Sequence, residues 1–218
     1  MKIIEISPRR KSLVALKLSE ELDFEFAVRE KSGLILIDFA YSCEKCLKED
    51  MEISENELKE LILESHSRRA KSKALWLISR KDYSSGGLIK KLGEEFPQFI
   101  SEQVCDRMIE LGLIDDIRFA ENLAENLIEI KGVAPRQAPY LMAEKGVEIS
   151  LAKKIIEQRN DDPKEQIKAI INKKYKNYLI DEKGLQKTFN ALIRKGFSYS
   201  DIKSVIRDFG EDIEDFGE

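Results

Sequence analysis

The sequence predicts a mainly helical protein in which a helix–turn–helix unit is repeated, preceded by a small β-rich extension. Three observations support this prediction. Glycine closes three similar helical segments at Gly93, Gly146 and Gly196, which are 53 and 50 residues apart. A helix-capping pattern at Ser54 marks the point where the spacing of apolar residues becomes helical. The residues before Cys46 are instead rich in branched and aromatic side chains, as strands are.

The N-terminal part contains short runs typical of half-buried strands. These runs are KIIEI (2–6), SLVALKL (12–18) and DFEFAV (23–28), and in the last of them Phe24, Phe26 and Val28 alternate along the chain. A fourth run, LILIDFA (34–40), fits either a buried strand or a short helix. We therefore expect a small sheet within residues 1–53.

A long helix is predicted to begin after Ser54. Ser54 and Glu57 have the spacing of a capping box, in which the serine oxygen accepts from the third helical N–H and the glutamate reaches back. The helical period then continues to about Arg80. Farther on, each of the three glycines is expected to cap its helix in the left-handed conformation, because glycine lacks the Cβ that makes this conformation costly.

The repeat becomes visible when three segments are stacked. Residues 146–156 and 196–206 align without a gap, and residues 100–109 align if EEFPQF is treated as an insertion. Four columns are then apolar in every copy: Ile100, Val147 and Phe197; Cys105, Ala152 and Ile202; Met108, Ile155 and Val205; Ile109, Ile156 and Ile206. We expect these columns to be core positions, with Cys105 as a small buried residue.

Two adjacent carboxylates, Asp115 and Asp116, are the strongest candidates for a catalytic or metal site. The repeat favours another role, because Asp161 and Asp162 stand in the same place before Pro163, a residue suited to the first helical position. Aspartate there accepts backbone N–H bonds and complements the positive end of the helix dipole. We expect both pairs to cap helices.

Composition and motifs argue against an enzyme, a membrane protein and a secreted protein. The sequence contains no phosphate-binding GxxxxGK[ST] loop, no dinucleotide fingerprint and no HExxH motif. Cys43 and Cys46 form a CxxC pair without the four ligands of a structural zinc site, and His66, in a polar helical run, is expected at the surface. No apolar run is long enough to span a membrane, and no signal peptide is evident, so a soluble cytoplasmic protein without metal or cofactor is expected.

The net charge of −4 is unevenly distributed along the chain. Residues 1–60 carry −4, residues 61–114 carry +2, residues 115–209 carry +3, and the tail GEDIEDFGE (210–218) carries five acids and no base. This surplus in the middle of the chain is too small for strong autonomous DNA binding, which needs many phosphate contacts. It is compatible with a protein that lies against a nucleoprotein.

Three segments stand out by their order and spacing: RKDYSSGGLIKKLG (80–93), GLIDDIRFAENL (112–123) and KGVAPRQAPYLMAEKGV (131–147). Together they resemble the RecX family of regulatory proteins. Residues 160–209 fit the family's third three-helix repeat, and the N-terminal part is similar to the extension of longer members. One departure is Gly87, where the family usually has Glu. Ser84 keeps its cap but loses the reciprocal bond, so we expect the start of this helix to fray.

The resemblance implies three tandem three-helix repeats in an elongated, curved array. The resulting divisions are 1–53, 54–114, 115–159, 160–209 and the tail 210–218. It also implies a monomer that binds the RecA recombinase filament on single-stranded DNA, with weak direct DNA contact. Family members slow filament extension, which lowers ATP hydrolysis and strand exchange and so modulates recombination, DNA repair and the SOS response.

Basic residues near the repeat junctions are the candidate partner contacts. They are Arg68, Arg69, Arg80, Lys81, Arg118 and Arg136, together with Lys173, Lys174 and Lys176 in the cluster NKKYKNY (172–178). Arg118 and Arg136 are expected to form a basic edge of the second repeat. In the lysine cluster, Tyr175 and Tyr178 suit base stacking, although a helix with a core-facing aromatic and solvated lysines fits the same pattern.

Two alternatives remain open from the residues alone. One is a stand-alone nucleic-acid-binding module, which would bind DNA without a protein partner and with a steep salt dependence. The other is a helical-repeat adaptor for a different protein, against which only the family resemblance argues.

Overall fold

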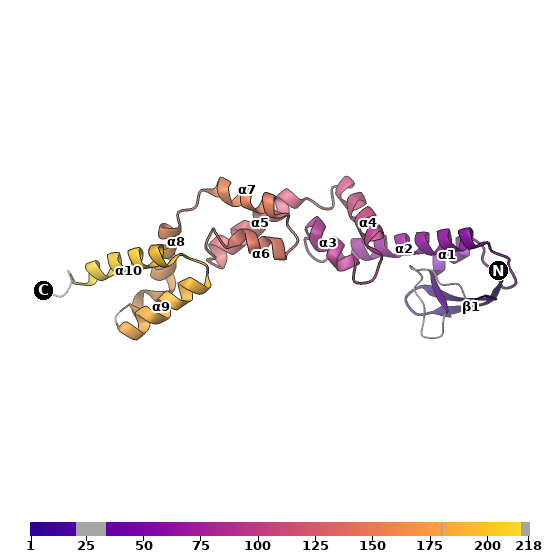
Figure 1. Cartoon of the computed structure of the whole chain (residues 1–218), viewed down its shortest axis with the longest axis horizontal. Coiled ribbons are helices and arrows are strands. Elements are labelled where there is room, and N and C mark those ends of the chain that lie inside the picture. The colour runs from indigo at the N-terminus through magenta and orange to yellow at the C-terminus, as the bar shows by residue number, and fades with distance from the viewer. Residues whose placement is uncertain (21–33, 180, 215–218) are drawn as a thin grey trace. The chain divides into compact units, whose positions relative to one another are not determined.

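A computed structural model describes residues 1–20, 34–179 and 181–214 of the chain (Figure 1). The chain divides into two compact units. Unit 1 comprises Met1–Tyr83 and Leu88–Ile114, and unit 2 comprises Ser84–Gly87 and Asp115–Glu218. The mainly helical fold with a small N-terminal sheet is confirmed.

Unit 1 begins with a three-stranded antiparallel sheet in the order β1-β2-β3. The strands are β1 (Ile3–Arg9), β2 (Leu13–Leu18) and β3 (Ile35–Asp38), followed by helix α1 (Phe39–Glu44). The ambiguous run 34–40 therefore forms a strand and then starts a helix, with Asp38 as the N-cap. The expected strand over residues 23–28 lies outside the described residues. Apolar side chains of the sheet pack against Leu58 and Ile62 of the long helix that comes after α1.

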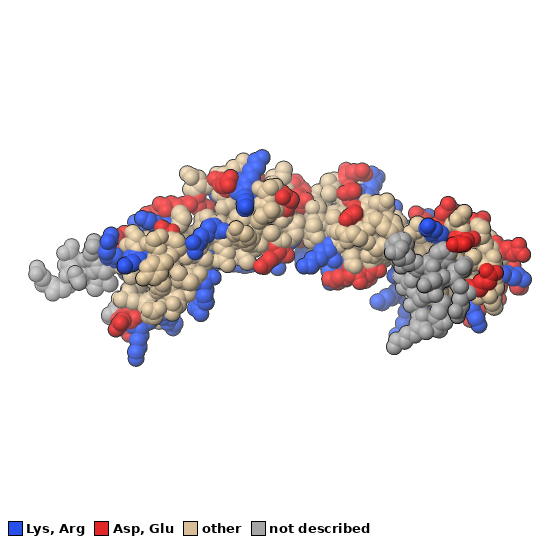
Figure 2. All heavy atoms as spheres, viewed as in Figure 1, with Lys and Arg blue, Asp and Glu red and all other residues tan. Residues whose placement is uncertain are grey.

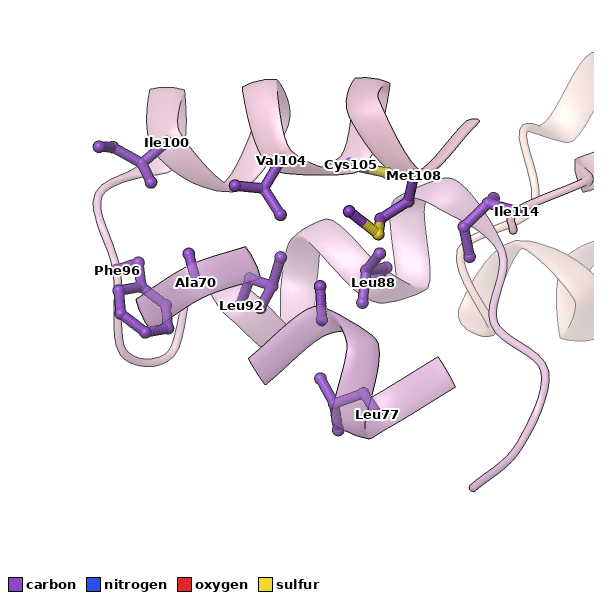
Figure 3. Packing of buried hydrophobic residues seen from close by; sticks show 11 residues of the cluster. Ala70, Leu77, Leu88, Leu92, Phe96, Ile100, Val104, Cys105, Met108 and Ile114 are labelled. Atoms are coloured by element: carbon purple, nitrogen blue, oxygen red, sulfur yellow. The ribbon is translucent and has the colours of Figure 1, made fainter. Parts of the chain in front are cut away.

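The long helix α2 (Glu55–Ile78) starts with the predicted capping box. Ser54 Oγ accepts from the Glu57 N–H at 3.2 Å, and Glu57 Oε2 accepts from the Ser54 N–H at 2.8 Å. The chain continues as α3 (Ser85–Leu92), whose first turn belongs to unit 2, and α4 (Gln98–Glu110). A second core lies among these three helices, where the side chains labelled in Figure 3 point toward one another.

Unit 2 contains two further cores, each formed by three consecutive helical segments. The first core is formed by α5 (Asp116–Glu125) with π-helix η1 (Asn126–Ile130), by α6 (Ala138–Glu144) and by α7 (Ile149–Arg159). The second is formed by α8 (Pro163–Ile170) with π-helix η2 (Ile171–Tyr175) and 3-10 helix η3 (Lys176–Tyr178), by α9 (Glu182–Arg194) and by α10 (Tyr199–Glu214). Met142 is fully buried in the first core and Leu192 in the second. In both repeats a π-helical turn, a rare feature, thus directly follows the first α-helix.

Most of the predicted repeat columns are buried, including Cys105. Ile109 is an exception, because it is 44 % exposed while its counterpart Ile156 is buried. Gly146 and Gly196 have the expected positive φ of 87° and 90°. The prediction for Gly93 is wrong, since its φ is not positive and its N–H still donates to Ile89 in the helical manner, at 2.8 Å.

His66 is also placed differently from the expectation. Its side chain is 3 % exposed and meets the Phe96 ring edge-on at a centroid distance of 6.1 Å. The surface role predicted for His66 is wrong, because this polar stretch of α2 turns one side into the core. The division boundaries at residues 53, 114, 159 and 209, and the elongated shape of the array, stay predictions.

Candidate functional site

The basic side chains predicted as partner contacts lie on several different elements. Figure 2 shows Lys and Arg side chains interspersed with Asp and Glu over the face in view. This mixture agrees with the small positive surplus of the middle of the chain. Several of these cations are already engaged by groups of their own unit.

Arg68 is engaged within unit 1. Its Nη1 and Nη2 donate to the two carboxylate oxygens of Glu44 at 2.6 and 3.1 Å, and its Nε donates to Glu64 at 3.0 Å. The guanidinium also lies 4.3 Å from the centroid of the Tyr41 ring. The hydrogen bond to Glu44 is the main reason that the pKa of Arg68 is raised. Arg68 thus ties α1 to α2, a structural role that its sequence neighbours do not reveal.

Arg69 lies partly inside unit 1. Its guanidinium stands 5.5 Å from the centroid of the Phe96 ring, and burial lowers the pKa of Arg69. The charges of Glu95 and Asp38 act in the opposite direction and favour the cation. Like Arg68, Arg69 therefore has contacts within unit 1 that give it a structural role.

Arg136 joins the second repeat to the third within unit 2. Its Nε donates to the Gly196 carbonyl, and its Nη2 donates to the Phe197 carbonyl at 2.9 Å. The Ala134 N–H donates to the Lys195 carbonyl beside them at 2.8 Å. The accepting carbonyls of Lys195, Gly196 and Phe197 lie in the turn between α9 and α10. Arg136 therefore contributes less to the expected basic edge with Arg118, because two nitrogens of its guanidinium already donate to this turn.

The same junction recurs at the start of unit 2. Ser84 Oγ donates to the Lys145 carbonyl at 2.7 Å, and this pair is 61 residues apart, as are Ala134 and Lys195. The backbones also touch here, since a Cβ on Gly86 would lie 2.5 Å from the Gly146 oxygen. In both junctions a loop before a helix packs on the Lys-Gly turn of the next repeat. Sequence comparison alone could have found this only through the shared 61-residue offset.

Asp115 and Asp116 have different roles. Asp115 Oδ1 accepts from the N–H groups of Ile117 and Arg118 at 3.1 and 3.0 Å, which confirms it as a helix cap. Asp116 instead accepts from the backbone N–H of Ser85 at 2.7 Å and from the Ser85 hydroxyl. The expectation that both acids cap was wrong for Asp116, which fastens the start of α3 to α5.

In the acidic pair of the third repeat, Asp161 and Asp162, the two roles are exchanged. Here the cap is the second member, because Asp162 accepts from the Lys164 N–H at 2.9 Å. Asp161 instead pairs with Arg159 at 2.8 Å. The two acidic pairs are therefore displaced by one residue relative to their helices, a shift that the sequence alignment did not show.

Arg80 and Lys81 lie near aromatic side chains at the end of α2. The Arg80 guanidinium is 4.3 Å from the centroid of the Trp76 ring, and Lys73 approaches the same ring at 5.4 Å. Lys81 Nζ is 4.6 Å from the centroid of the Tyr83 ring. Trp76 is 49 % exposed, so this group of cations and aromatics faces solvent. Sequence reasoning named the two cations but overlooked Trp76.

Arg118 and the lysine cluster lie on the surface of unit 2. Arg118 is exposed on the first turn of α5, and Lys173, Lys174 and Lys176 are exposed on η2 and η3. The Tyr175 and Tyr178 rings lie 6.2 Å apart between centroids. These cations are available for partner contact, and their actual ligands stay a prediction.

One further lysine is less available for such contact. Lys195 Nζ donates to the Lys131 carbonyl, and burial lowers the pKa of Lys195, with a smaller contribution from the positive charge of Lys174. Lys195 therefore belongs to the junction between the second and third repeats.

The arrangement offers cationic and aromatic groups suited to binding. Among the residues that the structure describes, no group of three or more His, Cys, Asp or Glu could hold a metal ion. Cys43 and Cys46 are exposed free thiols, whereas Cys105 is buried. Within the same described part, no helix is long and apolar enough to cross a membrane.

Comparison with known proteins shows a consistent family. Residues 151–206 match the family model described as "RecX, third three-helix domain". The chain is 29 % identical to the regulatory protein RecX of Clostridium tetani (strain Massachusetts / E88), over 93 % of this chain and 91 % of that protein. It is 30 % identical to the regulatory protein RecX of Streptomyces coelicolor (strain ATCC BAA-471 / A3(2) / M145), over 57 % of this chain and 70 % of that protein.

A solved structure shares the fold. A crystal structure of a regulatory protein RecX superimposes with a TM-score of 0.57 at 21 % identity, covering 95 % of this chain and 98 % of that one. A second, from Lactobacillus salivarius, gives a TM-score of 0.55 at 20 % identity, covering 66 % of this chain and 96 % of that one.

Proposed function

Because this chain belongs to the RecX family of regulatory proteins, we propose that its regulatory target is the RecA recombinase filament on single-stranded DNA. The protein binds this filament and limits its extension, its ATP hydrolysis and its strand exchange. It acts in the cytoplasm as a monomer, without a cofactor, and so modulates recombination, DNA repair and the SOS response.

The observation that carries this proposal is family membership, supported by the placement of the available cations. Exposed basic side chains lie at the end of α2, at the start of α5 and on the η2 turn. A protein that contacts successive filament subunits through several modest sites gains affinity because each later contact is intramolecular. Such binding does not need the extended basic surface that independent DNA binding requires.

Titration of the DNA-dependent ATP hydrolysis of the cognate RecA tests the proposal. We expect hydrolysis to fall when this protein is present at well below one copy per RecA monomer, because action at filament ends or across subunits affects many monomers at once. Undiminished hydrolysis at equal concentrations, together with no co-sedimentation with the filament, would remove RecA as the target. Equal inhibition of an unrelated DNA-dependent ATPase would point to simple competition for DNA instead.

A further inference from the structure

Helix α2 changes charge along its length. Its N-terminal half carries Glu55, Glu57, Glu60 and Glu64, whereas residues 65–81 contain six Lys or Arg and no acid. The C-terminal half of α2 and the residues just after it are thus a short basic segment within a chain of net charge −4. Such a segment can attract a polyanion locally even though the whole protein is acidic.

Only part of this segment is neutralised within unit 1. Arg68 is paired with Glu44 and Glu64, and Lys73 pairs with Glu95 at 2.9 Å. The other three surface cations of the segment, which are Lys71, Arg80 and Lys81, have no ion pair to a described residue. Lys71 lines a groove together with Asp106 and Glu110 but forms no ion pair with either of them. Asp82 directly follows Lys81 in the sequence.

Trp76 lies in the middle of the basic segment and half of its surface is exposed. Lys73 lies one helical turn before Trp76, and Arg80 follows just after the end of α2; both cations approach the indole ring. The cation of Arg80 lies against the indole ring at 4.3 Å from the centroid, which holds the side chain in place at the surface. The half-exposed indole therefore lies beside Arg80, a cation that forms no ion pair with a described residue.

We propose that Trp76 is a stacking platform for a base of single-stranded DNA, with Arg80 and Lys81 binding the flanking phosphates. Aromatic side chains stack on bases of any sequence because every base has a π-face, and neighbouring cations follow the backbone. Double-stranded DNA has its bases stacked internally, so the surface is selective for single strands. The inference deepens the proposed function by assigning DNA, and not RecA, as the ligand of this surface of unit 1.

The fluorescence of Trp76 is a direct probe, because the chain contains one Trp. The full-length protein is titrated with a twenty-nucleotide oligo(dT) at low salt, with excitation at 295 nm, in the absence of RecA. We expect saturable quenching of the indole by the stacked base and protection from iodide. Unchanged fluorescence up to high micromolar DNA, or equal quenching by a duplex of the same length, would overturn the stacking assignment.

Variants separate stacking from charge, with anisotropy of labelled oligo(dT) as the readout. We expect W76A to weaken binding at least about fivefold, the lower end of what one stacked base contributes. R80E is expected to weaken binding and to flatten its salt dependence, whereas R80K, which keeps the charge, retains most of the affinity.

The matched control is K154E, an equal charge change at an exposed site on α7. It is expected to leave oligo(dT) binding unchanged, and a loss equal to that of R80E would show that only total charge matters. If oligo(dT) does not bind while RecA hydrolysis is still inhibited, the surface contacts protein and the proposed function stands. If oligo(dT) binds and hydrolysis is unaffected, the platform stands and the proposed function fails.

Discussion

At the residue scale, close backbone contact explains why glycines occupy both sides of the first junction of unit 2, at Gly86 and at Gly146. Gly146 combines a φ of +87° with a position where any Cβ would collide with the backbone of Gly86 and Gly87. Gly87 stands where the family usually has glutamate. From the sequence, the only expected consequence of this change was the loss of the reciprocal capping bond. The structure adds that the Gly87 backbone lies against Gly146, where a Cβ on Gly146 would overlap the Gly87 nitrogen.

We expect Gly146→Ala to destabilise the protein more than Gly112→Ala. Both glycines have positive φ, but a Cβ at Gly112 would meet nothing within 4 Å. Gly112→Ala therefore measures backbone strain alone, about 1 kcal/mol. Gly146→Ala adds steric overlap, which costs roughly a further 1–3 kcal/mol. Urea unfolding followed by circular dichroism compares the two, and equal losses would contradict the close contact.

A pH dependence is expected from the ion pair between Lys73 and Glu95. The hydrogen bond from Lys73 holds the pKa of Glu95 below its ordinary value in the folded protein. The stabilisation is therefore complete above the pKa of an unfolded glutamate, about 4.3, and is lost as the pH falls through the lower folded pKa.

We expect Glu95→Gln to lose less stability than the wild type when the pH is lowered from 6 to about 3, which is below the pKa of an unfolded glutamate. Glu94→Gln is the control, because Glu94 pairs with Lys91 only three residues away. Thermal unfolding at several pH values measures the difference. Parallel curves for Glu95→Gln and the wild type would show that this ion pair contributes nothing to folding.

At the element scale, helices could be predicted where local sequence decides the outcome. The capping box of Ser54 and Glu57 fixes the start of α2 through groups three residues apart, so the printed sequence contains all that is needed. Ile109 and Gly93 were misplaced because their environment depends on tertiary packing. An apolar residue at a repeat position remains exposed when no neighbouring element covers it, and periodicity does not report this.

The start of α3 is expected to be ordered, contrary to the fraying that its glycines suggested. Ser84 Oγ accepts from the Gly87 N–H at 3.0 Å, and the Ser85 N–H donates to Asp116. We expect Asp116→Ala to speed hydrogen exchange at the Ser85 amide. Asp115→Ala should instead speed exchange in the first turn of α5. Rapid exchange of residues 84–90 in the wild type would restore the original expectation.

The candidate contacts also show what sequence cannot decide. Arg68 and Arg136 were named because they are basic and near junctions, and both are engaged by groups far away in the chain, 24 and 60 or 61 residues distant. Arg80 and Lys81 remained available because no described acid pairs with them. A cation's availability depends on whether the fold brings a carboxylate or carbonyl to it, which composition and spacing do not specify.

At the scale of the whole molecule, regulation is expected to depend on several contacts acting together. The available cations lie on α2, α5 and η2, and one chain links them, so each contact raises the effective concentration of the next. A single exposed charge contact contributes little by itself. We therefore expect R80E or R118E to weaken inhibition of RecA hydrolysis roughly two- to fivefold each.

Combining R80E and R118E with charge reversal at Lys173, Lys174 and Lys176 should multiply these effects, because distant sites contribute independently. The measurement is the protein concentration that halves RecA hydrolysis, with K154E as the control and circular dichroism to confirm folding. If one reversal abolishes inhibition as completely as the combination, a single dominant site carries the interaction. If the combination inhibits as well as the wild type, the filament is held through apolar contacts, because the cations then contribute no measurable affinity.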